Sequence, residues 1–507
     1  MRLHLLAVGT ALTLALAGCA SSGGLHPDGS PIDAGALKAR QSLAGTPVSP
    51  AAWPSADWWT GLNDPQLDQL MSEALKDNPS LAIADARARE AQAQVGFADA
   101  ARLPTLNASG SVSGARLPPN ILPGGGGSEN GGDGGAGGSQ QAARSHFMLA
   151  KYADLDFKWS LDLWGGKRAA WEAALGTARA SDVAARAARV ELSGNVARAY
   201  AQLGYAFTQH DLARAELVRA IDARQLTRQR VTAGIDNKIQ LRQGDAEVAS
   251  AQQQGALARR AIDSARSSLS VLLGKGPDRG LEIQRPHTLT PAQLAIPSSL
   301  PVELIGHRAD LVAARWRVEA ASKDIKSAKT EFLPNVSIGA LAGFIAVGSG
   351  SPFSLPQRFY EFGPTLSLPI FDGGRLRANL NGKDAQYDLA VAQYNQTLVR
   401  ALNQVSDGVS AMRSLDEQLA AQQRAEAAAR DAYELSQQRY KAGIGSYLES
   451  LSVRQQLLGA ERGTAQLKAQ KVDLSVQIIE ALGGGFQPRG DAPVLSSDAT
   501  SPNPSRS

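Results

Sequence analysis

The sequence predicts a mixed α/β membrane protein in which a few β-strands alternate with very long helices. The first observation is a strict alternation of apolar and polar side chains from Tyr152 to Trp164. This stretch is longer than most strands of globular proteins, and it has the length of a tilted strand that crosses a membrane. The second observation is the length of two proline-free helical segments, and the third is an internal repeat.

The alternating stretch has one apolar face and one charged face. Leu155 and Phe157 stand on the first face, and Asp156 and Lys158 stand on the second. A second alternating stretch, with weaker polar positions, runs from Glu361 to Ile370. An amphipathic strand of a soluble β-sandwich would show the same pattern, so these stretches alone leave both possibilities open.

Composition favours helices over a thick globular core. Of the 507 residues, 43% are hydrophobic but only 5% are aromatic, which suits closely packed helices. The net charge is +4 and no run of Lys or Arg stands out, so we expect no binding to nucleic acid. The histidines are isolated, and no nucleophile motif, phosphate loop or metal-ligand spacing occurs. We therefore expect no enzyme activity, no catalytic residue, no cofactor and no metal site.

The first residues predict an export signal and a lipid anchor. Residues 1–18 contain an apolar run that is too short to cross a bilayer as a helix. The run ends in Leu-Ala-Gly before Cys19, which resembles the bacterial lipoprotein box and implies cleavage before Cys19 and acylation of its thiol. Cys19 is the only cysteine of the chain, so it cannot form an intramolecular disulfide. We expect residues 19–63 to be a lipidated tether, with the outer membrane of a Gram-negative cell as its address.

An internal repeat organises the rest of the chain. Leu81 to Pro104 aligns without gaps on Leu311 to Pro334. Each copy is a helical pattern that ends at Leu-Pro, where proline stops the helix and its predecessor becomes extended. We therefore expect a first repeat at 64–274, a linker at 275–302 and a second repeat at 303–483.

Each repeat is expected to hold two strands and a helical hairpin. The predicted strands are 106–113 and 152–163 in the first repeat, and 335–343 and 360–371 in the second. Glycine-rich surface loops are expected at 124–138 and 348–357, and a disordered tail at 484–507.

The hairpins begin with proline-free runs from Ala169 to Thr232 and from Leu376 to Lys441. A helix of this length would extend about 95 Å. The expected hairpin tips lie near 230–237 and 439–446, where a glycine can take the left-handed conformation that closes a helix.

Four strands per chain cannot close a barrel, and lipid does not tolerate an open sheet edge. Three copies would supply twelve strands and six helical hairpins. The sequence therefore predicts a homotrimer that contacts outer-membrane lipid.

Three motifs give the chain a family resemblance. They are Trp58-Trp59 with Asp64-Pro65-Gln66-Leu67, the segment from Leu368 to Arg375, and Gln438-Arg439-Tyr440 with Gly443. With these motifs the chain resembles the TolC/OprM-type outer-membrane efflux proteins, in particular the lipid-anchored, NodT-like branch that serves resistance–nodulation–division (RND) pumps. The resemblance implies a trimeric 12-stranded outer-membrane β-barrel that continues into a long α-helical coiled-coil periplasmic barrel. Its implied partners are a periplasmic membrane-fusion adaptor and an inner-membrane RND pump.

The resemblance also assigns roles to residues at the hairpin tips. Glu449 matches a position where relatives often place an acidic residue facing the pore, so it is the candidate periplasmic gate. Val231 and Ser452 depart from the family pattern, and the composition of the gate does not follow from it. The positions that match the adaptor-docking tips are Arg230, Gly234, Ile235, Arg439, Tyr440, Gly443 and Ile444.

The expected function is passive conduction of drugs or other small molecules from the pump and adaptor to the exterior. One alternative is the outer-membrane channel of a type I protein secretion system, which the sequence hardly distinguishes. Another is a non-conducting periplasmic coiled-coil lipoprotein, which would explain the long helices and Cys19 but not the alternating strands.

Overall fold

The computed structural model describes residues 24–37, 41, 43, 53–117, 146–287, 289, 300–347 and 353–487. The predicted signal segment, Cys19, the loop at 124–138, residues 348–352 of the second loop and all but the first residues of the tail lie outside the described residues. The chain forms two compact units. One holds the sheet with the adjoining helix ends, and the other holds the remaining helices.

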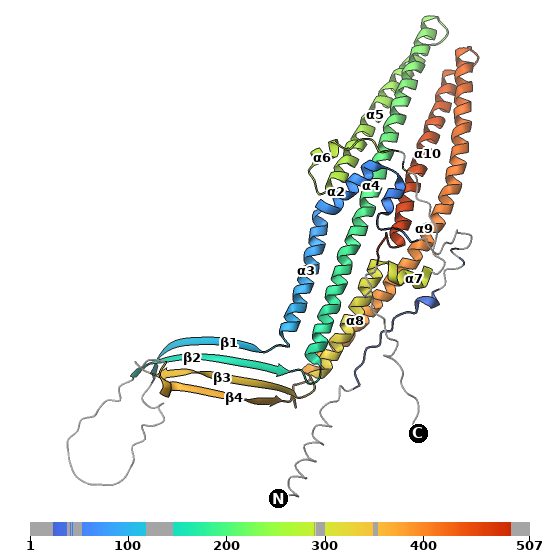
Figure 1. The fold of residues 1–507 in the computed structure, drawn as a ribbon. Helices are drawn as coiled ribbons and strands as arrows, with labels where there is room; N and C mark the ends of the chain where they lie inside the picture. Colours follow the sequence, from blue (N-terminus) through green and yellow to red (C-terminus); the bar gives the residue numbers. More distant parts are fainter. Residues whose placement is uncertain are drawn as a thin grey trace, which may run out of the picture. The chain divides into compact units, whose positions relative to one another are not determined.

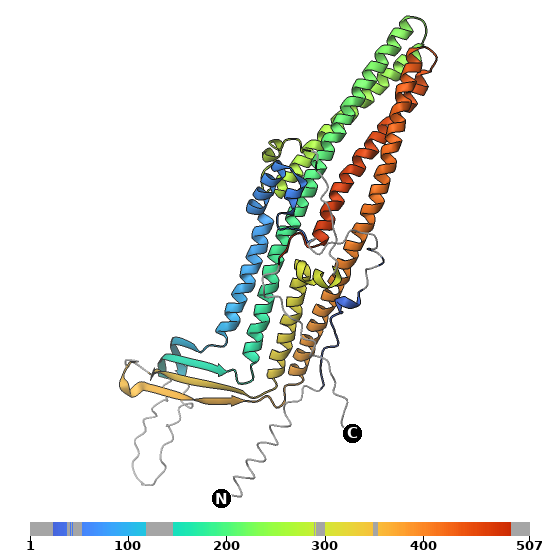
Figure 2. The same ribbon diagram turned by 45° about the vertical axis from the view of Figure 1, so that its right-hand side comes forward.

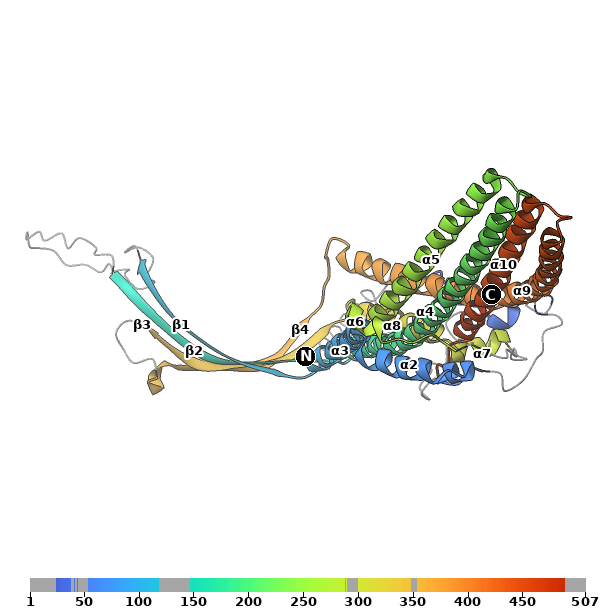
Figure 3. The ribbon, with the colours of Figure 1, turned by 90° about the horizontal axis from the view of Figure 1, so that it is seen from above.

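The sheet unit contains one antiparallel sheet in the order β1-β2-β3-β4 (Figure 1). Viewed from above, the strands run side by side and the sheet is curved (Figure 3). Within the described chain, β1 and β4 each pair along one edge only. The strands are β1 (Thr105–Leu117), β2 (His146–Leu161), β3 (Asn335–Val347) and β4 (Arg358–Ser367), the last preceded by the 3-10 turn η3 (Leu355–Gln357).

The register of the strands separates apolar from polar side chains. Leu155 stands opposite Ala108 on one side and Ala342 on the other, and these positions belong to the apolar face. β3 follows the alternation least, since Leu341 and Ile345 lie on the polar side. The apolar face carries Leu106, Phe157, Trp159, Ile338, Phe362 and Leu366, and the polar face carries Asn107, Ser109, Asp154, Asp156, Lys158, Glu361 and Thr365.

The polar face is held together by its own contacts. Ser109 Oγ donates a hydrogen bond to the Asp154 carboxylate across the β1–β2 pair. Lys158 Nζ lies 3.0 Å from Asp156 Oδ1. The alternation expected from the sequence is thus confirmed, and its two faces belong to one continuous four-stranded sheet.

The predicted start of the third strand at 335 agrees with β3, but other predicted strand ends differ from the structure, both toward the loops and toward the helices. Toward the loops, all four strands extend beyond the prediction, since segments such as 114–117 pair well without a clear polar alternation. Toward the helices, β4 ends at Ser367 and not at 371. Proline at position 369 cannot donate to a sheet, and Ser367 already pairs with Asn335, the first residue of β3. β2 likewise ends before Asp162, whose carboxylate accepts hydrogen bonds from the first turn of the next helix.

Two long hairpins contain most of the helical residues. α4 (Gly166–Thr232) and α9 (Arg375–Lys441) have 67 residues each, and α5 (Lys238–Leu272) and α10 (Tyr447–Ala481) have 35 each. At 1.5 Å per residue, the longer helices extend about 100 Å. In Figures 1 and 2, α4 runs beside α5 and α9 runs beside α10 toward the tips. The very long helices predicted from the proline-free runs are confirmed.

Short helices complete each repeat. α3 and α8 have 22 residues each, and both end just before a Leu-Pro pair that leads into a strand. α2 begins where the buried Asp64 carboxylate accepts hydrogen bonds from the backbone of Gln66 and Leu67. The short elements are η1 (Ala34–Ala36), η2 (Trp58–Leu62), α2 (Pro65–Asp77), α3 (Pro79–Ala100), α6 (Pro277–Leu281), α7 (Leu300–His307) and α8 (Ala309–Thr330).

In each repeat the return helix of the hairpin meets the start of a short helix. Asn78 Nδ2 donates to the carbonyl of Leu272 at 2.6 Å, which joins the end of α5 to the start of α3. Arg308 Nη1 donates to the carbonyl of Ala481 at 3.0 Å, which joins the end of α10 to the start of α8. Gly483 follows α10 with φ +104°, and a Cβ there would lie 2.0 Å from the carbonyl oxygen of His307. This junction therefore requires glycine.

The helical core lies around these junctions. The larger cluster joins α2, α4, α5 and the end of α10, and includes Leu70, Met71, Tyr200 and Leu269. A second cluster joins α7, α8, α9 and α10. In the part of the chain that the structure describes, none of the helices combines the length and apolar character needed to cross a membrane.

Exchange of one side chain on each face of β4 tests which face meets lipid. We expect Phe362→Arg to reduce the protein recovered in the outer membrane, because an arginine near the bilayer midplane costs about 2–4 kcal/mol. Thr365→Arg places the same group on the polar face and should be tolerated. Membrane fractionation with heat-modifiable gel migration measures both, and equal recovery of the two variants would contradict the assignment of faces.

Candidate functional site at the hairpin tips

Both hairpins turn at a glycine in the left-handed region. Gly234 has φ +75° and Gly443 has φ +79°, a conformation that residues with a Cβ adopt only with strain. The backbone N–H of Ile235 donates to the carbonyl of Arg230 at 2.9 Å, and that of Ile444 donates to the carbonyl of Arg439 at 3.0 Å. The two tips therefore share one turn geometry, as their matching sequences predict.

The return helices start with side-chain caps. Asn237 caps α5 in a reciprocal arrangement with Gln240, and Ser446 Oγ accepts a hydrogen bond from the Glu449 N–H at 3.1 Å. This bond places Glu449, the candidate gate residue, in the first turn of α10. Its carboxylate lies 3.6 Å from Arg439 Nε, and both side chains are about half exposed. Such an exposed pair contributes at most about 1 kcal/mol.

A buried network joins the two tips of one chain. Arg230 Nε donates to Asp236 Oδ2 at 2.9 Å, and Arg230 Nη1 donates to the carbonyl of Tyr440 at 3.0 Å. The Tyr440 hydroxyl donates to Asp236 Oδ2 at 2.7 Å. It also lies 3.1 Å from Thr227 Oγ1, and the Arg230 guanidinium stacks 4.6 Å above the tyrosine ring. Four residues from two hairpins thus provide hydrogen-bond partners for one another.

The electrostatics of this network favour its charged form. Hydrogen bonding to Asp236 raises the pKa of Arg230. Burial raises the pKa of Asp236, but the hydrogen bonds from Arg230 and Tyr440 outweigh it, so the net shift is downward. Burial raises the pKa of Tyr440 to about 12. At neutral pH the arginine and the carboxylate are therefore charged and the tyrosine keeps the proton that it donates.

The predicted tip residues fall into four groups. Arg230 and Tyr440 belong to the buried network, and the two glycines form the turns. Ile235 and Ile444 are 63% and 69% exposed, so each tip presents an apolar side chain to its surroundings. Arg439 is partly exposed and pairs only with Glu449 among the ion pairs of the described residues.

The sequence analysis missed Asp236 and Thr227. Asp236 stands where the second repeat has Gly445, so a difference between the two copies was the available signal. The first repeat likewise has Val231 where the second has Tyr440. The two tips share their backbone turn but not their side chains, and the network forms only because they differ.

A second polar layer lies further from the tips and was also not predicted. It joins all four hairpin helices through Glu216 and Arg219 of α4, Glu247 of α5, Arg430 of α9, and Arg454 and Glu461 of α10.

Arg454 is the centre of this layer and is only 2% exposed. Its guanidinium lies 3.0 Å from Glu216 and donates to Glu247 at 2.7 Å. Arg219 donates to both carboxylate oxygens of Glu461 at 2.9 Å. Burial raises the pKa of Glu216 although Arg454 and Arg219 oppose the shift. The carboxylate therefore depends on these cations to stay charged.

Truncation of Arg454 tests this dependence. Arg454→Ala should lower the free energy of unfolding by about 3–5 kcal/mol, because it removes the cation that pairs with Glu247 and leaves the buried Glu216 with Arg219 alone. Arg242→Ala is the matched control, since Arg242 pairs with Asp245 at 3.3 Å but its side chain is 84% exposed. Chemical denaturation of the detergent-solubilised protein measures both variants. Equal loss of stability would refute a special role for the buried layer.

Among the described residues, no group of His, Cys, Asp and Glu side chains could hold a metal ion. The tip therefore offers ion pairs, hydrogen bonds and exposed apolar side chains. These groups can hold two hairpins together and exchange partners with another protein.

Comparison with known proteins identifies a family to which this chain is similar. Residues 70–275 and 300–484 match the family described as outer membrane efflux protein. The chain is 36% identical to the fusaric acid resistance protein FusA of Burkholderia cepacia over 379 residues, which cover 74% of this chain and 68% of FusA. It is 31% identical to the multidrug resistance outer membrane protein MdtP of Shigella flexneri over 443 residues, which cover 87% of this chain and 88% of MdtP.

Solved structures agree. The outer membrane protein VceC of Vibrio cholerae superposes with a TM-score of 0.75 at 32% identity, covering 86% of this chain and all of VceC. The outer-membrane channel OprN superposes with a TM-score of 0.78 at 28% identity, covering 92% of this chain and all of OprN. The chain therefore belongs to the outer membrane efflux protein family, which is a family of efflux ducts of the Gram-negative outer membrane and not a family of enzymes.

Proposed function

We propose that three copies of this chain form a passive exit duct, closed at rest by its hairpin tips. The observation that carries this proposal is a sheet with one apolar and one polar face, whose two outer edges have no partner strand among the described residues. Unpaired backbone groups cost several kcal/mol each in lipid. The outer edge of β1 would pair with β4 of a neighbouring copy, and three copies would close a 12-stranded barrel with its apolar face toward lipid.

The helices support the same arrangement. α3 exposes the large apolar side chains of Ile83 and Phe97, and α9 exposes Leu389 and Val399. α3 leads into β1 and α9 follows β4, so each exposed helix is joined in sequence to an edge strand. A neighbouring copy that pairs with the edge strands would also cover these helices and continue the barrel into a coiled-coil tunnel.

The partners follow from the chemistry of the tips and from the names of the relatives. MdtP is named a multidrug resistance protein and TtgC of Pseudomonas putida a probable efflux pump outer membrane protein. We infer that this chain receives small organic molecules from an inner-membrane pump of the RND class. A periplasmic adaptor would bind the exposed Ile235, Ile444 and Arg439. The duct itself would catalyse no reaction, and the pump would supply the energy.

The relatives favour efflux over type I protein secretion, since their names refer to resistance and efflux. The two-faced sheet speaks against a non-conducting tether, which would have no use for an apolar sheet face.

Opening would require the two tips of each chain to separate. The network of Arg230, Asp236, Tyr440 and Thr227 resists this separation. An adaptor that binds the open tips more tightly than the closed ones would shift the equilibrium by the difference between its two affinities. Glu449 would contribute less to the closed state than Asp236, because its pair with Arg439 is exposed and longer.

Conductance in planar bilayers tests both the duct and its gate. Asp236→Asn should raise the resting conductance of the purified protein without adaptor, because it removes the charge that holds Arg230. A charged hydrogen bond contributes about 1.5–3 kcal/mol, so the open fraction should rise roughly 10- to 100-fold. Asp245→Asn is the matched control, since Asp245 carries the same group on α5 in an exposed ion pair.

The outcomes separate the two claims. Conductance that rises in Asp236→Asn and not in Asp245→Asn supports the gate. Conductance that is measurable and equal in both variants and the parent protein refutes the gate but not the duct. Absence of conductance in all three, from material that is trimeric by mass, refutes the duct.

Cys19 is proposed as the site of lipid attachment, on the sequence of its lipoprotein box. Mass spectrometry of the mature protein should find Cys19 as the first residue with acyl chains attached. Cys19→Ala should remain in the outer membrane if the sheet spans it, because the barrel would hold the protein without an anchor. An unmodified Cys19 at the mature N-terminus would refute the anchor.

A further inference from the structure

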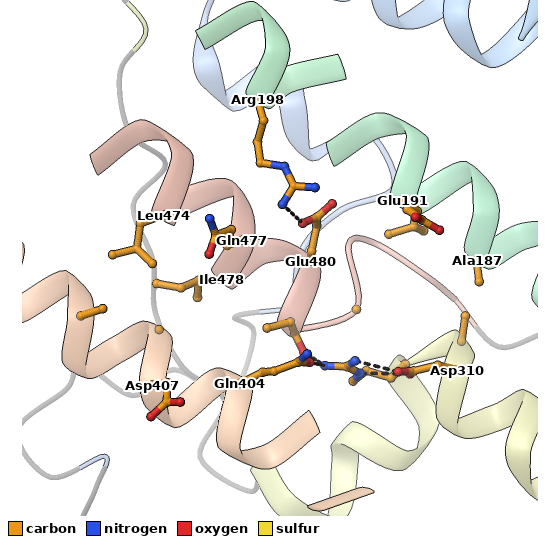
Figure 4. A pocket seen from close by; sticks show the side chains of 17 residues that line it. Ala187, Glu191, Arg198, Asp310, Gln404, Asp407, Leu474, Gln477, Ile478 and Glu480 are labelled. Carbon is orange, nitrogen blue, oxygen red and sulfur yellow. Dashed lines mark hydrogen bonds and ion pairs between the residues drawn. The ribbon is translucent and has the colours of Figure 1, made fainter. Parts of the chain in front are cut away.

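The helical unit contains a cavity of about 690 Å³ that the tip mechanism does not use. It lies between α4, α9 and the junction of α10 with α8 (Figure 4). Val476 and Ile479 of α10 pack into the larger core cluster, whereas Leu474 and Gln477 line the cavity on the other side of the helix. Its volume is in the range of cavities that bind small organic molecules.

Two glycines on the long helices make room for the end of α10. A Cβ at Gly194 of α4 would lie 1.6 Å from Glu480 Oε1. A Cβ at Gly408 of α9 would lie 2.7 Å from Ile478 Cγ1. A larger residue at Gly194 would displace the Glu480 side chain, and a larger residue at Gly408 would displace the Ile478 side chain. The last turns of α10 and the Glu480 side chain pack against α4 and α9 because these helices have glycine at positions 194 and 408.

The charges that line the cavity do not balance. Arg198 lies 3.1 Å from Glu480, and Arg308 lies 2.7 Å from Asp310 and also donates to Gln404 and a backbone carbonyl. Figure 4 shows both pairs as dashed lines. The lining holds four carboxylates and two guanidinium groups, because Glu191 and Asp407 add to the two paired acids. Its net charge is therefore negative by two when Glu480 is ionised.

Glu480 is poorly compensated although it has a partner. Burial raises its pKa to about 7; Arg198 opposes the shift, whereas Glu191 and Asp473 add to it. When Glu480 is ionised, its carboxylate would therefore favour the binding of a second cation in the cavity. The charged and titratable groups around it are Glu191 and Arg198 of α4, Arg308 and Asp310 at the start of α8, Asp407 of α9 and Asp473 of α10.

The rest of the lining is apolar. It includes Ala187, Val190, Ala411, Leu474 and Ile478. A small metal ion would leave these walls uncovered, and the described residues hold no cluster suited to a metal ion. Glu191 and Asp407 are exposed to water, and a neutral apolar molecule would displace water from these carboxylates without supplying a positive charge. The combination fits a molecule that carries one positive charge on an apolar body.

We infer that this cavity is a binding site for amphipathic organic cations, with Glu191, Asp407 and Glu480 as the groups that recognise the charge. The lining residues given above all belong to one chain, and binding can be measured separately from conduction. A role of this site in binding exported molecules rests on the proposed duct.

Binding of tetraphenylphosphonium tests the inference. Calorimetry with the full-length protein in lipid nanodiscs, and empty nanodiscs as blank, should show saturable binding of one cation per chain. Combined Glu191→Gln and Asp407→Asn should weaken the affinity roughly tenfold or more, because the surplus negative charge is lost. Asp263→Asn is the matched control, since Asp263 is exposed on α5 and does not line the cavity.

Three further arms make the result decisive. Ala411→Phe should block binding by filling the cavity without changing its charge. Triphenylphosphine oxide, a neutral molecule of similar shape, should not bind. The affinity of the parent protein should rise from about pH 6 to about pH 8 as Glu480 ionises, and Glu480→Gln should abolish this dependence.

Binding that survives the double variant and Ala411→Phe would overturn the site, as would equal binding of the neutral molecule. Absence of saturable binding by the parent protein would overturn it as well. Conductance of the same preparations in planar bilayers distinguishes this failure from failure of the duct, because a protein that conducts without binding refutes only the cavity as a cation site.

Discussion

The backbone hydrogen bonds of the sheet impose the constraint on which the rest of the architecture depends. Four strands pair in a continuous register, but the outer edges of β1 and β4 have no partner in the described chain. In water such edges invite aggregation, and in lipid they are not tolerated. A sheet of this kind therefore needs further strands at both edges before it can span a membrane, and in the proposed trimer other copies of the chain supply them. The proposed function therefore requires that copies of the chain associate.

This constraint passes to the helices through short connections. β2 ends at Leu161 and α4 begins at Gly166; β4 ends at Ser367 and α9 begins at Arg375. With so few residues between strand and helix, the symmetry of the proposed barrel would also apply to the adjoining helix ends. The apolar side chains that α3 and α9 expose are what this requirement leads one to expect.

Much of the fold follows from local sequence, because local physics decides it. A helix ends shortly before Leu103-Pro104 and another shortly before Leu333-Pro334, because proline cannot continue a helix. Gly234 and Gly443 adopt the left-handed backbone conformation, which glycine takes more readily than other residues. The strand ends were harder, since they depend on which residues of the neighbouring strand remain to pair. Ser367 ends β4 because Asn335 is the first residue of β3, and the sequence of β4 alone does not contain that information.

The polar networks could not be predicted for the same reason. Arg230 reaches the carbonyl of Tyr440 across 210 positions of sequence, and Arg454 reaches Glu247 across 207. Such contacts depend on the axial register of two hairpins, which a repeat in the sequence does not reveal. Differences between the two copies, such as Asp236 against Gly445, are visible in the sequence, but their role depends on how the two tips pack together.

The Arg439–Glu449 pair at the tip and the Arg454 layer differ in burial, and this difference bears on how a long coiled coil could open at one end. Alanine-rich seams fix axial register poorly, because each small contact resembles the next, whereas a buried charge is satisfied in only one alignment. Arg454 is almost inaccessible, but Arg439 and Glu449 at the tip are half exposed. Free energies of local opening increase with burial. Separation that starts at the tips would therefore stop at the Arg454 layer, so the entrance could change while the helices beyond it keep their register.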